Sequence, residues 1–130
     1  MKSGKYLPDT DIVITFLNGD KNVEARLNSA ETVYLSVIVL GELLYGAKNS
    51  KNVDENIQKI KQFMDQCVLL FVNELISIHY SDVKLALKRK GRPIPENDIW
   101  IGATAIHHGL TLSSRDDHFS FIDGLILEKW

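Results

Sequence analysis

Cysteine is almost absent from this chain, which has only Cys67 among its 130 residues. No disulfide can therefore form within the chain, and such sparse cysteine is typical of a reducing compartment, so we expect a cytoplasmic protein. An N-terminal signal pattern is also lacking, and no apolar run is long enough to span a membrane. We therefore expect no membrane partner.

A strong excess of charge of either sign is lacking too, since 15 basic and 17 acidic residues leave a net charge of −2. The molecule as a whole has no basic field that would attract nucleic acid, so such binding would need a local patch. Linkers, internal repeats and low-complexity segments are absent as well. At a length near the commonest domain size, we predict a single domain that spans residues 1–130.

Short apolar segments alternate with helical patterns along the chain. Strands are predicted at residues 6–8, 33–35, 68–72, 110–113 and 125–127. The intervals between them contain segments with the apolar spacing of amphipathic helices. This alternation predicts an α/β layer fold with a mainly parallel sheet of four to five strands.

Capping residues and glycines predict where several helices begin and end. Thr10 or Asp11 could cap the first helix, and Ser36 is the predicted N-cap of the helix that contains Glu42. Gly46 is predicted to end or weaken that helix. A later helix is predicted at residues 98–108, after a loop with two prolines.

One acid interrupts an otherwise apolar stretch. Residues 35–47 read LSVIVLGELLYGA, and Glu42 is their only charged residue. A helix that is apolar all round belongs in a protein interior, and a carboxylate there needs a partner. Glu42 is therefore either one half of a buried salt bridge or a ligand of a metal ion.

Three more acids stand at informative positions. Asp9 directly follows the first predicted strand and Asp116 follows the fourth, so both belong at the carboxyl edge of the sheet, where parallel sheets bind ligands. Asp98 leads the apolar run IWIGATAI. Taken singly, Asp9 could be a turn or capping residue, Asp116 a loop acid, and Asp98 an acid that serves the helix dipole.

Taken together with Glu42, these acids favour a metal site. Four carboxylates at one edge of a sheet would repel one another and raise one another's pKa values. A divalent cation removes that cost, and ligands that are all oxygen suit Mg²⁺ or Mn²⁺ better than zinc. Because spacing alone does not show that the four side chains meet, their convergence is a hypothesis.

Four stretches of the chain resemble one known family in order and separation. They are YLPDTDIVITFLNG (residues 6–19), LSVIVLGELLYGA (35–47), KRKGRPIPENDIWIGATAIHHGLTLSSRDDHF (88–119) and GLILEKW (124–130). The chain resembles the PIN-domain ribonucleases, specifically the VapC-type toxins of bacterial toxin–antitoxin pairs. The resemblance implies a three-layer α/β/α fold, cleavage of RNA that depends on Mg²⁺ or Mn²⁺, a homodimer, and inhibition by a cognate antitoxin.

The same resemblance implies which residues form the site. The catalytic and metal-binding acids of the family correspond to Asp9, Glu42, Asp98 and Asp116. Thr10 and Ser114 match small hydroxyl positions that support the site in relatives. The expected mechanism is attack on phosphorus by a water that the metal activates, with one carboxylate accepting the proton.

Two departures from the family pattern concern further acids. Asp11 stands where the family usually has Asn, and it either adds negative charge near the site or caps a helix. Asp117 doubles the final acid. We favour Asp116 as the ligand because it follows Ser114 and Arg115 directly, and we expect Asp117 to support it.

Cations near the acids in sequence are the candidates for RNA contact. Arg92 precedes Asp98 closely and Arg115 adjoins Asp116, so either could hold a phosphate group. Lys84 is interpreted as part of a solvated helix face. His118 lies near Asp116, where a structural role is the favoured interpretation and contact with substrate the alternative.

Two other functions are compatible with parts of the sequence. Asp9 and Asp11 fit the acidic signature of a haloacid-dehalogenase-like phosphatase, although Glu42 and Asp98 would then have no role. The second alternative is a catalytically inert PIN-type domain that only binds a partner. Asp11 distinguishes the phosphatase from the metal-dependent nuclease, because the phosphatase requires this carboxylate and the nuclease does not.

Overall fold

The centre of the molecule is a five-stranded sheet in which all neighbouring strands are parallel. The computed structural model describes residues 1–130, and the strand order is β3-β2-β1-β4-β5. The strands are β1 (Lys5–Pro8), β2 (Thr32–Ser36), β3 (Val68–Leu70), β4 (Thr111–Ser114) and β5 (Ile126–Lys129). The predicted α/β fold with a parallel sheet is confirmed, although β3 ends earlier than predicted.

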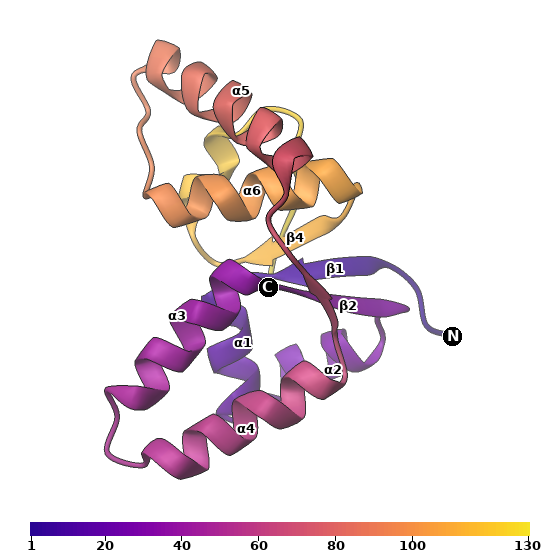
Figure 1. The fold of residues 1–130 in the computed structure, drawn as a ribbon. Coiled ribbons are helices and arrows are strands. Elements are labelled where there is room, and N and C mark those ends of the chain that lie inside the picture. Colours follow the sequence, from indigo (N-terminus) through magenta and orange to yellow (C-terminus); the bar gives the residue numbers. More distant parts are fainter.

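Helices cover both faces of this sheet, as Figure 1 shows. Helices α1 to α4 lie on one side, and α5 and α6 lie together on the other. Their bounds are α1 (Thr10–Leu17), α2 (Lys21–Asn28), α3 (Val37–Lys48), α4 (Val53–Asp65), α5 (Glu74–Lys90) and α6 (Glu96–His108), with a short 3₁₀ helix η1 at Asp117–Phe121. The architecture is therefore the expected three-layer α/β/α arrangement. No helix is both long and apolar enough to cross a membrane.

The strand order reverses its direction at β1. The chain passes from β1 outward to β2 and β3, then returns through α5 and α6 to place β4 on the other side of β1. Such a reversal opens a crevice at the carboxyl ends of β1 and β4, because the connections of these two strands leave toward opposite faces of the sheet. Leu7 of β1 and Leu112 of β4 are fully buried, so the strands beneath this crevice are anchored in the core.

One helix start follows its predicted signal, and three helix ends differ from the prediction. Ser36 accepts a hydrogen bond from the Ile38 backbone N–H and caps α3, as predicted. The N-cap of α1 is Asp9, whose carboxylate accepts from the Thr10 N–H, so the prediction of Thr10 or Asp11 was wrong. Gly46 does not end α3, which continues to Lys48. Helix α6 also starts two residues before Asp98, at Glu96.

Helix α3 is not an interior helix, contrary to the expectation from its composition. Its buried residues are Val39, Leu43 and Ala47, which form a single stripe at helical spacing. Tyr45 on another face is 72% exposed, and Glu42 is half-buried. The helix belongs to an outer layer, and Ile38, Leu40 and Leu44 beside the stripe are only partly buried against the core.

Candidate active site

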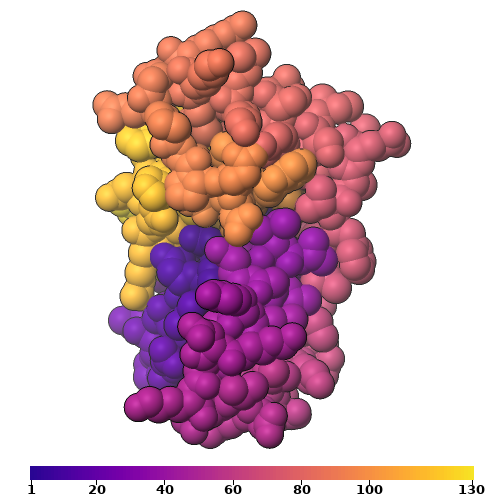
Figure 2. Space-filling view, turned by 60° about the vertical axis from the view of Figure 1, so that its left-hand side comes forward, coloured from indigo at the N-terminus to yellow at the C-terminus, as the bar shows by residue number.

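Four segments that are far apart in the sequence meet at the reversal point of the sheet. Asp9 follows β1, Asp116 follows β4, Glu42 comes from α3, and Asp98 lies in the first turn of α6. In Figure 2 the indigo start of the chain reaches the surface between the purple α3 segment, the orange α6 segment and the yellow C-terminal part. The fold therefore places the four predicted acids at the same edge of the sheet, and of these only Asp98 and Asp116 have ligand atoms within 4.8 Å of each other.

Asp9 is the most deeply buried of these acids, with 6% of the residue exposed. Its Oδ1 accepts the Thr10 backbone N–H at 2.8 Å, and its Oδ2 accepts the Ser114 hydroxyl at 3.0 Å. Burial is the main cause that raises the pKa of Asp9 to about 7. The hydrogen bonds from Thr10 and Ser114 oppose this rise, whereas the charges of Asp11 and Asp98 add to it.

The partner of Glu42 is a hydroxyl group. Thr10 Oγ1 donates to Glu42 Oε1 at 2.8 Å. None of the ion pairs in the structure includes Glu42, so the salt-bridge interpretation was wrong. Half-burial and a hydrogen bond to a neutral group leave the carboxylate with its charge uncompensated, and this suits a ligand of a cation.

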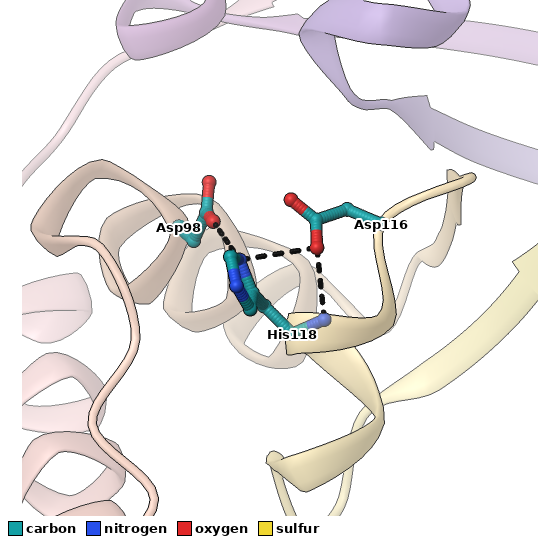
Figure 3. Close-up of side chains that lie close together, drawn as sticks. All are labelled: Asp98, Asp116 and His118. Atoms are coloured by element: carbon teal, nitrogen blue, oxygen red, sulfur yellow. Dashed lines mark hydrogen bonds and ion pairs between the residues drawn. The ribbon is translucent and has the colours of Figure 1, made fainter.

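Asp98 and Asp116 are joined by a histidine. His118 Nδ1 lies 3.0 Å from Asp116 Oδ1 and 3.4 Å from Asp98 Oδ2, as Figure 3 shows. Burial raises the pKa of Asp98; the charges of Asp116 and Glu42 also raise it, while His118 acts in the opposite direction. The ligand atoms of Asp98, Asp116 and His118 all lie within 4.8 Å of one another, so these three residues could hold a metal ion.

Two hydroxyl side chains connect the acids into one network. Thr10 donates its backbone N–H to Asp9 and its hydroxyl to Glu42. Ser114 Oγ donates to Asp9 and accepts the Asp116 backbone N–H at 2.9 Å. The supporting positions suggested by resemblance thus lie between the acids, and they fix the relative orientation of the carboxylates.

The two additional acids have different surroundings. Asp11 Oδ2 accepts the Arg115 backbone N–H at 3.1 Å, and Asp11 Oδ1 is buried without a hydrogen-bond partner. The Asp117 side chain is 77% exposed and forms an ion pair with Lys129, which lowers its pKa. Asp11 therefore tethers the loop after β4, whereas Asp117 is directed to β5.

The cations suggested for RNA contact are partly engaged within the protein. Arg115 is exposed, and its Nε donates to the Trp130 carbonyl at 2.8 Å. The Arg92 guanidinium lies 5.0 Å from the centre of the Phe121 ring. Lys84 pairs with Glu96 on the α5–α6 surface, which agrees with its interpretation as part of a solvated helix face.

A hollow of about 590 Å³ opens beside the acids. Its lining residues come from α1, α3 and α6, and they are Thr10, Val37, Ile38, Gly41, Glu42, Tyr45 and Asn97. Glu42 and Thr10 thus connect the acid network to the surface. This hollow therefore opens the Glu42 end of the acid network to a ligand from solvent.

The histidine was the site residue that sequence reasoning assigned least well. Asp116 Oδ1 accepts the His118 backbone N–H at 2.9 Å and so caps η1. This tight turn brings the imidazole of His118 back over the carboxylate that precedes it by two residues. The available signal in the sequence was that Asp116 stands two residues before His118. This spacing indicates that the two residues lie near each other, but it does not indicate that His118 also contacts Asp98.

The amino-acid sequence of this chain is similar to one protein family and to several named proteins. The model of the PIN domain family matches residues 6–125. Ribonuclease VapC1 of Haemophilus influenzae (strain R2866) is 31% identical, over 96% of this chain and 97% of the relative. The protein of Shigella flexneri named tRNA(fMet)-specific endonuclease VapC is 30% identical, over 97% and 98% respectively.

Solved structures agree with these sequence matches. VapBC2 from Rickettsia felis, solved bound to a DNA fragment from their promoter, aligns with a TM-score of 0.91 and 29% identity, over 97% of this chain and 98% of that one. VapBC-1 from nontypeable Haemophilus influenzae aligns with a TM-score of 0.88 and 30% identity, over the same shares of the two chains. Both similarities extend over nearly the whole length of the chain.

Proposed function

Because this chain belongs to the PIN domain family and, within it, to the VapC ribonucleases, we propose that it is an endoribonuclease that depends on Mg²⁺ or Mn²⁺. The observation that carries the proposal is that Asp9, Glu42, Asp98 and Asp116 come from four separate segments and lie near enough to influence one another's charge, with ligand atoms of Asp98 and Asp116 within 4.8 Å of each other. These acids are the proposed catalytic and metal-binding residues.

The electrostatics of the acids support a bound cation. Burial raises the pKa values of Asp9 and Asp98, and neighbouring carboxylates raise them further. A divalent cation would offset this repulsion, and the carboxylate oxygens are ligands that Mg²⁺ and Mn²⁺ accept. Such an ion would lower the pKa of a bound water and would stabilise negative charge on a phosphodiester.

The chain's own residues would position this chemistry. Thr10 holds Asp9 and Glu42 through its N–H and its hydroxyl, and Ser114 holds Asp9 and the loop that carries Asp116. These hydrogen bonds keep the carboxylates in place without supplying a compensating charge. Arg92 and Arg115, both exposed, are proposed to contact RNA phosphates near the acids.

We also propose that the protein is the toxin of a toxin–antitoxin pair and binds a cognate antitoxin. Support comes from its similarity to VapBC structures of Rickettsia felis, Haemophilus influenzae and Salmonella typhimurium.

We further propose that the protein forms a homodimer. Exposed apolar side chains near the start of α5, with Phe71 at 66% and Ile78 at 58% exposure, favour a protein contact there.

The phosphatase alternative receives little support from the surroundings of Asp11. That carboxylate is occupied by the Arg115 N–H on one oxygen and is buried on the other, so it does not face an incoming substrate. An inert binding domain would not need Thr10 and Ser114 to hold the acids in one network. The nuclease accounts for both sets of contacts.

Cleavage of RNA by the purified protein tests the proposed activity. A tRNA is the first substrate, since one relative is named as a tRNA endonuclease. We expect cleavage with Mg²⁺ or Mn²⁺, none with a chelator, a loss of at least about 100-fold in Glu42→Gln, and retention in Asp11→Asn. A phosphomonoester serves as the control substrate. Turnover of the monoester that requires Asp11 and ignores Glu42→Gln would contradict the proposal.

A further inference from the structure

An imidazole lies where two of the four acids converge. His118 Nδ1 is 3.0 Å from Asp116 Oδ1 and 3.4 Å from Asp98 Oδ2 (Figure 3). Its side chain is 47% exposed, so the ring is open to solvent and to ions. None of the other three histidines of the chain approaches an acid in this way.

The position of His118 is fixed by the turn that carries it. Its backbone N–H is held by Asp116 Oδ1, and Phe119, the next residue, is fully buried. Helix η1 is therefore anchored in the core on one side and to the acid network on the other. The imidazole does not depend on a flexible loop for its place beside Asp98 and Asp116.

The distances from His118 Nδ1 to the two carboxylates are compatible with ligands of one ion, and the two carboxylate oxygens lie within 4.8 Å of each other. For metal–ligand bonds of about 2.1 Å, two ligands at a right angle are separated by about 3.0 Å. The two nitrogen–oxygen distances, 3.0 Å and 3.4 Å, fit this value with only small side-chain adjustment. The same atoms could thus coordinate a cation without movement of the backbone.

We propose that His118 is itself a metal ligand, binding through Nδ1 the ion that Asp98 and Asp116 hold, and that it makes this site prefer Mn²⁺ to Mg²⁺. The inference rests on the proposed metal-dependent function and adds a nitrogen ligand to its carboxylates. Imidazole is a better ligand for transition metals than for Mg²⁺, which favours oxygen. A donor set of two carboxylates and one imidazole therefore selects a transition-metal ion.

Electron paramagnetic resonance of Mn²⁺ tests this inference directly. The free-ion signal measures binding, and pulsed measurements detect ¹⁴N nuclei bonded to the ion. We expect a nitrogen coupling in the wild type that changes when the histidines are labelled with ¹⁵N. In His118→Ala the coupling should disappear and Mn²⁺ affinity should fall at least about tenfold, with a smaller change for Mg²⁺ in competition. His108→Ala, on the far end of α6, is the matched control and should behave as the wild type.

The outcomes separate this inference from the proposed function. Mn²⁺ that binds the wild type without nitrogen coupling, or with coupling that persists in His118→Ala, would overturn the role of His118 and leave the carboxylate site intact. Equal losses of Mn²⁺ and Mg²⁺ affinity in His118→Ala would overturn the selectivity. Failure of Mn²⁺ to bind the wild type at all would overturn both the inference and the metal-dependent mechanism.

Discussion

At the scale of single residues, the site depends on a carboxylate that the fold keeps away from water. Asp9 is buried, and its two oxygens are occupied by Thr10 and Ser114. The hydrogen bonds stabilise the charged form, yet burial outweighs them and the pKa is raised to about 7. Without a cation, ionisation of Asp9 near neutral pH therefore opposes folding.

This shift predicts a pH dependence of stability. The unfolded chain has an Asp pKa of about 3.9, so between about pH 4 and pH 7 the folded protein holds a proton at Asp9 that the unfolded chain has released. In chelator, the free energy of unfolding should consequently fall as the pH rises through this window. Asp9→Asn should reduce that fall, as measured by urea denaturation at a series of pH values. An unchanged pH profile in Asp9→Asn would show that Asp9 is not the responsible group.

The hydroxyl of Thr10 offers a second test at this scale. Thr10→Val removes the hydrogen bond to Glu42 while keeping the shape of the side chain, and Thr10→Ser keeps the hydroxyl. We expect Thr10→Val to lose about 1 kcal/mol of stability and most of the RNA cleavage, because Glu42 loses its orientation. Thr10→Ser should remain close to the wild type in both assays. Similar activity in Val and Ser variants would show that this hydroxyl does not position Glu42.

The positions of the acids could be predicted from the sequence, whereas the links between them could not. Asp9 and Asp116 stand out because they follow strands, and Glu42 stands out because it interrupts an apolar stretch. The contact of Ser114 with Asp9 joins residues 105 positions apart, and local patterns carry no information on such pairs. For the same reason, the contact of His118 with Asp98 was not foreseen.

At the scale of elements, α1 and the loop after β4 are joined through Asp11. This side chain accepts the Arg115 backbone N–H, one residue before Asp116. Asp11→Ala should therefore loosen the loop, and we expect several-fold faster hydrogen exchange at the Arg115 amide, together with weaker RNA cleavage. Asp11→Asn keeps an acceptor oxygen and should preserve both. Faster exchange at the Arg115 amide in both Asp11→Asn and Asp11→Ala would contradict the tethering role of Asp11.

Helix α3 provides a test of its own. Gly46 lies inside this helix, and an added Cβ would meet nothing within 4 Å. Gly46→Ala should raise the free energy of unfolding by about 0.5–1 kcal/mol, since glycine is costly in a helix interior. Gly102 in α6 is the contrasting position, because a Cβ there would come within 2.8 Å of Ile122 Cδ1. Urea denaturation measures the free energy of unfolding of Gly46→Ala and of Gly102→Ala. A loss of stability in Gly46→Ala would contradict this account of α3.

The misjudgement of α3 has a physical cause. Its composition is apolar on every face, which suggested a buried helix, but only Val39, Leu43 and Ala47 are buried, while Ile38, Leu40 and Leu44 pack against the core from partly exposed positions. Composition reports how apolar a helix is, and it does not report how many neighbours the fold provides. Tyr45 and Gly41 on the outer side border the hollow beside Glu42, so the exposed apolar face belongs to the approach to the site.

At the scale of the whole molecule, the order of the strands creates the site. The alternation of strands and helices predicted a parallel α/β sheet, but many strand orders satisfy that alternation. The observed order places β1 beside β4, so Asp9 and the segment from Ser114 to Asp116 meet at a crevice between them. Strand order depends on packing between distant segments, which explains why resemblance rather than periodicity indicated the convergence of the acids.

The most direct test of the central claim is the location of a Mn²⁺ ion in crystals of the protein by anomalous diffraction. The account predicts a peak within about 2.0–2.6 Å of carboxylate oxygens of Asp98 and Asp116. The same crystals of Asp98→Asn should show a much weaker peak. A wild-type structure with Mn²⁺ only at surface acids such as Asp123, or with no ordered ion, would contradict the claim that these four carboxylates form a metal site.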